Sequence, residues 1–154
     1  SKQNNGRVAL SLSDSFCVDR HRGAFLNFIK EYVSILFANE DEIKSLYQVD
    51  EFESAVKQAL IDCEIAVLTR GSKGSVVIAE GQHLKLKPET VNNVIDTTGA
   101  GDAYAAGFLF GLVNGKTPEI CGQLGGIIAA EIISDYGARA KKDLNLIVKE
   151  NLID

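Results

Sequence analysis

Short apolar runs alternate with longer segments of helical periodicity through most of the sequence, and this alternation constrains the fold more than any other feature. The strand-like runs lie at residues 7–13, 34–38, 65–70, 75–79 and 82–87. Helical patterns cover residues 25–33, 39–47, 50–60, 102–114, 117–136 and 143 onward. Strands that alternate with helices predict an α/β fold in helix–sheet–helix layers, with a mostly parallel central sheet.

Three local signals refine the predicted helices. Asp50 and Glu53 have the spacing of a capping box, and Thr117 with Pro118 has the pattern of an N-cap and first helical position. The segment 102–114 is apolar nearly all round, so we expect that helix to be buried on every side.

Composition excludes several classes of protein. The 154 residues are 45% hydrophobic and 24% charged, which is typical of a globular chain and not of a disordered one. No apolar stretch approaches the roughly 20 residues that a membrane-spanning helix needs, so we expect no membrane partner. The net charge of −5 offers no basic face for a nucleic-acid polymer. An anionic ligand must therefore be held by backbone amides, a helix end or a metal ion.

The three cysteines are widely spaced, and no CxxC pair exists. A structural zinc site is therefore not expected, and we interpret the cysteines as reduced, small core residues of a cytoplasmic protein. The sequence also contains no methionine and begins with a polar stretch at Ser1. We therefore expect the chain to be a fragment of a longer protein.

The segment Asp96–Asp102, DTTGAGD, connects a predicted strand to a predicted helix. The small residues Gly99, Ala100 and Gly101 would let consecutive backbone N–H groups converge on an anion, assisted by the helix dipole. Asp102 at the edge of that cradle could accept a proton from an attacking hydroxyl. The alternative is that Asp102 only caps the helix. The segment matches neither a P-loop nor a dinucleotide fingerprint.

Two further patterns follow predicted strands. Asn39 and Glu42 have the spacing of a capping box, or of a polar pair that steers Mg²⁺ and its waters towards phosphates. Thr69, Gly71 and Gly74 form a glycine-rich segment that is either a plain turn or a place where the backbone approaches a nucleotide. Ligands of α/β sheets bind at the carboxyl ends of strands, so these loops are candidates for one site.

The stretch DTTGAGDAYAAGFL, Asp96 to Leu109, resembles a signature of the ribokinase/phosphofructokinase B-type carbohydrate kinases. The Asn39/Glu42 pair and the segment from Thr69 to Gly74 resemble two further family motifs in the expected order. AAEIISDYGARA, residues 129–140, is similar to the helix and loop that border the ATP base. The resemblance runs from about residue 7 to the end and implies a ribokinase-like fold.

The resemblance implies an ATP-dependent phosphotransferase. Asp102 would deprotonate the acceptor hydroxyl, and the amides of Gly99, Ala100 and Gly101 would form the anion hole. The nucleotide site would be organised by Thr69, Gly71, Gly74, Gly126, Asn39 and Glu42. Mg²⁺ would be held by Glu42 through water, and Asp96 is similar to the family's ligand for a monovalent cation such as K⁺.

Residues 10–21 and 34–42 look most like adenosine kinases and their bacterial sugar-kinase-like relatives. The family's acceptor-binding Asp, Gly-Gly motif and β-sheet lid belong to an amino-terminal half that is not found here. We therefore interpret residues 1–154 as the nucleotide-binding, catalytic carboxyl-terminal part, with any homodimer formed through the missing lid. The expected substrate is a nucleoside, adenosine first, or a sugar. The alternatives are a kinase for another sugar or sugar phosphate, and a nucleotide-binding fragment without catalysis.

Overall fold

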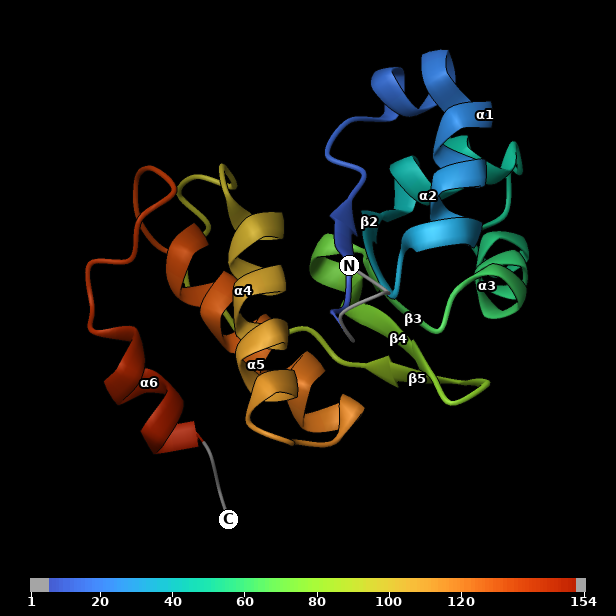
Figure 1. Ribbon diagram of the computed structural model, residues 1–154. Helices are drawn as coiled ribbons and strands as arrows, with labels where there is room; N and C mark the ends of the chain where they lie inside the picture. The colour runs from blue at the N-terminus through green and yellow to red at the C-terminus, as the bar shows by residue number, and fades with distance from the viewer. Residues whose placement is uncertain (1–5, 152–154) are drawn as a thin grey trace. The chain divides into compact units, whose positions relative to one another are not determined.

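A computed structural model describes residues 6–151 of the chain. The chain divides into two compact units, Ser1–Gly71 with Ser75–Lys85, and Ser72–Gly74 with Leu86–Asp154. Within the described residues, the first unit carries the sheet and the second carries the last three helices (Figure 1). The elements up to the end of the sheet are β1 (Ala9–Ser11), α1 (Ser15–Tyr32), β2 (Ile35–Asn39), α2 (Glu40–Tyr47), α3 (Phe52–Asp62), β3 (Ile65–Thr69), η2 (Gly71–Lys73), β4 (Ser75–Ala79) and β5 (Gln82–Leu86).

The sheet has the strand order β1-β2-β3-β4-β5. The first three strands are parallel, and β4 runs antiparallel to β3. Glu80 and Gly81 both have positive φ, 54° and 72°, as a two-residue type I′ hairpin between β4 and β5 requires. The predicted α/β layers and central sheet are therefore confirmed, with the parallel part restricted to β1–β3. In that part the strands end at one common edge of the sheet.

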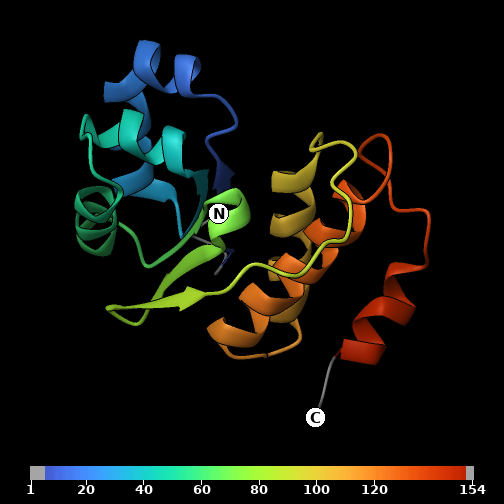
Figure 2. The same ribbon diagram turned by 180° about the vertical axis from the view of Figure 1, so that it is seen from behind.

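One face of the sheet packs against α1, α2 and α3 (Figure 2). Alternate strand residues point to this face because side chains in a strand alternate between its two sides. The buried cluster joins strand residues Leu36, Ala38, Ala66, Leu68, Val76 and Ile78 to helix residues that include Val18, Ile29, Ile43, Leu46, Phe52, Ala55, Val56 and Ala59. This core fixes the positions at which β2 and β3 end.

The first helix is longer than the pattern predicts. It begins after Asp14, whose Oδ1 accepts hydrogen bonds from the N–H groups of Phe16 (2.6 Å) and Cys17 (3.0 Å). His21 has non-helical dihedral angles, so a kink separates the first turns from the predicted part. The preceding strand is correspondingly shorter, Ala9–Ser11 instead of residues 7–13.

The capping box predicted from Asp50 and Glu53 is wrong. Helix α3 begins at Phe52 with Glu51 at the N-cap position, and no side chain caps it. The Glu53 carboxylate instead accepts a hydrogen bond from Lys85 Nζ at 3.2 Å. Glu53 therefore pairs with Lys85, 32 residues away in the sequence, and does not cap the helix as the local spacing predicted.

The second unit contains α4 (Ala100–Val113), α5 (Pro118–Ile133) and α6 (Leu144–Asn151). Helices α4 and α5 pack closely because glycines face the neighbouring helix. A Cβ on Gly107 would lie 2.7 Å from the Leu124 carbonyl oxygen, and one on Gly125 would lie 2.6 Å from Tyr104 Cε1. The predicted cap of α5 is confirmed, since Thr117 Oγ1 accepts from the N–H of Ile120. The helix ends at Ile133, a few residues before Gly137.

Helix α4 is not buried on every side, contrary to its apolar composition. Tyr104, Gly107, Phe108 and Gly111 are buried. Phe110 is 40% exposed, and Val113 at the end of the helix is 79% exposed. When a helix is apolar on all sides, its sequence does not indicate which side packs against the rest of the protein.

The three cysteines are free thiols. Cys121 is buried, and burial raises the pKa of the partly buried Cys63 to about 11, as expected of inert core thiols. Cys17 is exposed, so its assignment to the core is wrong. Across residues 6–151, no helix combines the length and the apolar character that crossing a membrane requires.

Candidate active site

The loop before α4 ends in a left-handed residue. Gly99 is the N-cap of the helix, with φ of 79°, a conformation that favours glycine. A Cβ on Gly99 would also lie 2.6 Å from the Cβ of Ala138, so neither the dihedral angles nor the space allows a side chain. The backbone N–H of Ala100 donates to the Thr97 carbonyl at 3.2 Å, which closes the loop as a tight turn. An anion that recruits the Ala100 amide would have to displace this bond.

The first turn of α4 is open at Gly101 and Asp102. Both residues are exposed, and a Cβ added to Gly101 would meet nothing within 4 Å. No side chain makes the cap of this helix, so Asp102 does not play the capping role that was its alternative interpretation. The first intrahelical bond runs from the N–H of Ala103 to the Gly99 carbonyl at 2.9 Å. The N–H groups of Gly101 and Asp102 precede it and have no intrahelical acceptor, as is general for a helix start.

Asp96 joins this loop to the segment after α5. Its Oδ1 accepts from the N–H of Thr98 at 2.9 Å, and its Oδ2 accepts from the N–H of Gly137 at 3.0 Å. Hydrogen bonds from the Thr98 side chain and backbone, and then from Gly137, hold the pKa of the Asp96 carboxyl below its ordinary value. The carboxylate is thus charged and fixed between two loops. Its oxygens are the ligand type that a K⁺ ion needs, so the residue fits the predicted cation role.

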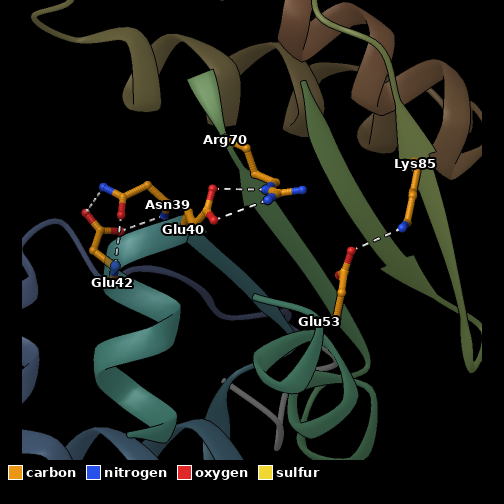
Figure 3. A network of polar contacts seen from close by, with 6 residues as sticks. All are labelled: Asn39, Glu40, Glu42, Glu53, Arg70 and Lys85. Carbon is orange, nitrogen blue, oxygen red and sulfur yellow. Dashed lines mark hydrogen bonds and ion pairs between the residues drawn. The ribbon is translucent and has the colours of Figure 1, made fainter. Parts of the chain in front are cut away.

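Asn39 and Glu42 form the predicted capping box at the start of α2 (Figure 3). The N–H of Glu42 donates to Asn39 Oδ1 at 2.8 Å. The N–H and Nδ2 of Asn39 donate to Glu42 Oε2 (2.9 Å) and Oε1 (2.8 Å). Both carboxylate oxygens are therefore occupied, and the side chain has one rigid position.

Glu42 is buried, with 7% of its surface exposed. Burial raises the pKa of its carboxyl, hydrogen bonding to Asn39 opposes this rise, and the charges of Asp14 and Asp41 add to it. Among the described residues 6–151, no three Cys, His, Asp or Glu side chains cluster as a metal site would require. A Mg²⁺ ion fits here only in the predicted manner, through water and with phosphate oxygens as further ligands.

The turn after β3 depends on two glycines. Gly71 and Gly74 have φ of 54° and 85°. A Cβ on Gly74 would lie 2.1 Å from the carbonyl oxygen of Leu86, so the backbone passes too closely for any side chain. Thr69, at the end of β3, lies in register with Asn39 at the end of β2. These two predicted nucleotide contacts are therefore neighbours on one edge of the sheet.

Sequence reasoning missed a pair of residues at this edge. Arg70 and Glu40 lie directly beside Thr69 and Asn39, and their side chains form an ion pair (Figure 3). Thirty residues separate them in the sequence, so no local motif signals the contact. The parallel register of β2 and β3 is the signal that could have found it.

A groove of about 470 Å³ lies within the second unit. Its walls come from residues 89–95, from α5 and from Ile147 of α6. Gly126 lies beside it, because a Cβ on Gly126 would be 3.4 Å from Cγ of the lining residue Glu89. The segment predicted to border the base supplies Ala130, Glu131 and Ser134 to the lining.

The predicted site residues thus fall into two groups. Asn39, Glu42, Thr69 and Gly71 lie in the first unit. Gly74, Gly126 and the segment 96–102 lie in the second. Within each unit the structure brings residues from separate segments together, through the β2–β3 register in one and through the bond from Gly137 to Asp96 in the other.

Comparison with known proteins shows the family to which the chain belongs. Residues 1–144 match the pfkB family of carbohydrate kinases. A sugar kinase of Archaeoglobus fulgidus, itself uncharacterized, is 39% identical over 111 residues, which cover 72% of this chain and 44% of that protein. The chain therefore spans less than half of the length of that curated relative.

Solved structures have the same fold. The crystal structure of adenosine kinase from Sinorhizobium meliloti superposes with a TM-score of 0.93 at 37% identity, over 97% of this chain and 46% of that one. The nucleoside kinase of Methanocaldococcus jannaschii, an archaeal member of the ribokinase family, gives a TM-score of 0.81 at 26% identity, over 96% and 48% of the two chains. The ribokinase-like fold predicted from the sequence is confirmed.

Proposed function

Because the chain belongs to the pfkB family of carbohydrate kinases, we propose that residues 1–154 are the nucleotide-binding, catalytic carboxyl-terminal half of an ATP-dependent kinase. The enzyme would transfer the γ-phosphoryl group of ATP to a hydroxymethyl group of a nucleoside or sugar. The observation that carries this proposal is the open first turn of α4, where an exposed carboxylate lies beside unpaired backbone N–H groups.

Asp102 acts as the general base in this proposal. Its carboxylate takes the proton of the acceptor hydroxyl while the oxygen attacks the γ-phosphorus and the bond to the β-phosphate oxygen breaks. The N–H groups at Gly101 and the neighbouring positions, together with the positive end of the helix dipole, stabilise the charge on the transferring group. The absence of a side chain at Gly101 leaves room for phosphate oxygens to approach the backbone.

The groove beside Gly126 has a size suited to a nucleobase, and its lining combines apolar side chains with the amides of Asn92 and Asn93 and the carboxylates of Glu89 and Glu131. Thr69, Gly71 and Gly74 are the other nucleotide contacts in the proposal, at a turn whose two glycines have positive φ.

Mg²⁺ and a monovalent cation complete the proposal. A bound Mg²⁺ would neutralise phosphate charge as it develops, and Asn39 with Glu42 would orient its water ligands from their locked capping box. A K⁺ ion at Asp96 would support the two loops that the carboxylate already links.

Adenosine is the acceptor that we favour, because a structure of an adenosine kinase matches 97% of this chain with a TM-score of 0.93. A sugar or a sugar phosphate is the alternative, since the relatives also include a sugar kinase. A cytoplasmic location and a homodimer formed through the lid stay predictions of the family resemblance.

One observation favours a second candidate for the isolated chain. The chain covers only 44% of the length of its sugar kinase relative. A half without an acceptor site cannot orient an acceptor or exclude water. The chain by itself would then bind nucleotide without transferring phosphate.

Two measurements test the proposal. The longer protein, obtained by extending the reading frame upstream of Ser1, is screened for ATP consumption against adenosine, ribose, fructose phosphates and other nucleosides. The 154-residue chain is titrated with ATP and Mg²⁺ by calorimetry. We expect acceptor-dependent ADP release from the first and saturable binding from the second. Consumption without any acceptor dependence, or no nucleotide binding, would contradict the proposal.

A further inference from the structure

The Arg70 side chain reaches from the turn after β3 to the start of α2. Its Nε donates to Glu40 Oε2 at 3.0 Å, and its Nη2 donates to Glu40 Oε1 at 3.2 Å (Figure 3). Two parallel bonds between a planar guanidinium and a carboxylate fix both the distance and the orientation of the two groups. The Glu40–Arg70 pair is therefore a geometric constraint as well as a charge contact.

The surroundings of the pair strengthen that constraint. Only 22% of the Arg70 side chain and 24% of the Glu40 side chain are exposed. The guanidinium carbon lies 4.0 Å from the centre of the Phe52 ring, so the ring supports the planar group from one face. A second ion pair in the same view, Lys85 with Glu53, is exposed by 64% and 57% and has no such support. Solvent screens an exposed pair of that kind, so it constrains little.

The Glu40–Arg70 pair joins two segments that both carry candidate site residues. Arg70 lies between Thr69 and Gly71, and Glu40 directly follows Asn39 in the first turn of α2. Asn39 and Thr69 are register partners at the ends of neighbouring parallel strands. The ion pair therefore ties the segment that carries Asn39 and Glu42 to the turn that carries the nucleotide-site glycine.

We propose that Arg70 is a positioning residue for nucleotide binding: through Glu40 it holds the glycine turn after β3 in fixed register with the capping box of α2. This inference rests on the proposed function, because it assigns both segments to the nucleotide site. In this role Arg70 acts on the nucleotide only through the segments that it positions. Small displacements of binding groups have large effects on affinity and rate, so a constraint between the two segments matters more than its contribution to stability.

Hydrogen exchange on the 154-residue chain tests the constraint without any nucleotide. Arg70→Met removes the charge and the forked donors while keeping much of the apolar stem. We expect faster amide exchange in residues 70–74 and 39–42, with exchange in α3 and β4 unchanged. The control variant Lys85→Met removes the exposed ion pair and should leave exchange in both segments at the wild-type rate.

Nucleotide titration in the presence of Mg²⁺ tests the consequence for binding. We expect Arg70→Met to weaken binding by about ten-fold or more while the melting temperature shifts by only a few degrees, since loss of orientation acts on affinity directly. Arg70→Lys keeps the charge but not the fork, so we expect an intermediate affinity. In the double variant Glu40→Gln with Arg70→Met, the affinity should equal that of Arg70→Met alone, because paired residues do not add.

The outcomes separate this inference from the proposed function. Wild-type affinity in Arg70→Met, or unchanged exchange in residues 70–74, overturns the positioning role and leaves the kinase proposal standing. Additive losses in the double variant show that the two side chains act independently and also overturn it. Failure of the wild-type chain to bind nucleotide overturns the proposed function, and with it the role of Arg70 in binding, whereas the exchange result still decides whether the constraint exists.

Discussion

The backbone N–H of Gly137 donates a hydrogen bond of 3.0 Å to the carboxylate of Asp96, 41 residues earlier in the chain. The other carboxylate oxygen of Asp96 accepts from Thr98 within the same loop. One side chain thus connects the segment that leads into α4 with the segment that follows α5. The geometry of the candidate anion site depends on this connection.

Replacing Asp96 with Asn should lower the melting temperature at pH 7, because an amide has one acceptor oxygen for two backbone donors. The pKa of Asp96 is lowered in the folded protein, so its contribution to stability is present above the ordinary carboxyl pKa of 3.8 and is lost as the pH falls through the folded-state value. Thermal melts from pH 7 to pH 3 should show a constant difference between wild type and variant above about pH 4. Below that pH, the difference in melting temperature between wild type and variant should become smaller as the pH falls.

The exposed carboxylate of Asp50 offers a control, and Asp50→Asn should melt with the wild type throughout. Equal melting curves for wild type and Asp96→Asn would mean that the bond to Gly137 does not hold the two segments together.

Gly101→Ala and Gly99→Ala should separate binding from folding. Gly101 lies in the first turn of α4 with open space around it, so a methyl group there meets no protein atom. We expect its melting temperature to stay equal or rise slightly, since Ala favours a helix by roughly 0.5–1 kcal/mol over Gly. ATP binding should weaken markedly, because the methyl group would occupy the space that phosphate oxygens need.

Gly99→Ala should instead unfold at a lower temperature. The φ of 79° and the 2.6 Å approach to Ala138 both oppose a side chain there. Calorimetry and thermal melts of the two variants give the comparison. Undiminished ATP binding by a well-folded Gly101→Ala would show that the backbone at this turn does not meet phosphate.

Glu42→Gln tests the Mg²⁺ role of the buried carboxylate. Gln has one oxygen for the two Asn39 donors, so we expect the variant to lose about 1 kcal/mol of stability at pH 7. A titration of the full-length kinase with Mg²⁺ at saturating ATP should show a higher concentration at half-maximal rate and a lower maximal rate. Superimposable titration curves would limit Glu42 to capping α2.

The same variant should alter the pH dependence of stability. Burial raises the folded-state pKa of Glu42, so its contribution to stability is full below the ordinary value of 4.5 and is lost as the pH rises through the folded-state value. Wild type should therefore gain stability from this group on acidification towards pH 4.5, and Glu42→Gln should lack that component. Parallel stability curves for the two proteins would contradict the raised pKa.

Local patterns predicted the parts of the fold that depend on local physics. The capping box of Asn39 with Glu42 and the N-cap Thr117 could be predicted because each depends on a side chain that reaches only three residues along the chain. The β2 and β3 strands follow from continuous apolar runs, as expected for buried strands. The same reasoning failed for Glu53, whose partner Lys85 is distant in the sequence and available only after the sheet forms.

The candidate site divides in the same way. The loop before α4 could be identified as a candidate because small residues at a helix start leave backbone N–H groups accessible, and this depends only on the local sequence. Arg70 with Glu40, and Gly137 with Asp96, could not, because these contacts require the β2–β3 register and the path of the chain after α5. The side of α4 that packs against α5 could not be predicted either, because the close contacts of the α4 glycines depend on which helix lies beside α4.

The rate of phosphoryl transfer by Asp102→Asn in the full-length protein tests the central claim most directly. Asn keeps the shape of the side chain but cannot accept the proton, and Glu119→Gln provides a matched control because Glu119 is an exposed acid in the first turn of α5. With Asp102 as the base, turnover at saturating ATP and acceptor should fall by at least ~10²–10⁴ in Asp102→Asn while ATP affinity stays near the wild-type value. Glu119→Gln should turn over normally. Turnover of Asp102→Asn within a few-fold of wild type would contradict the account.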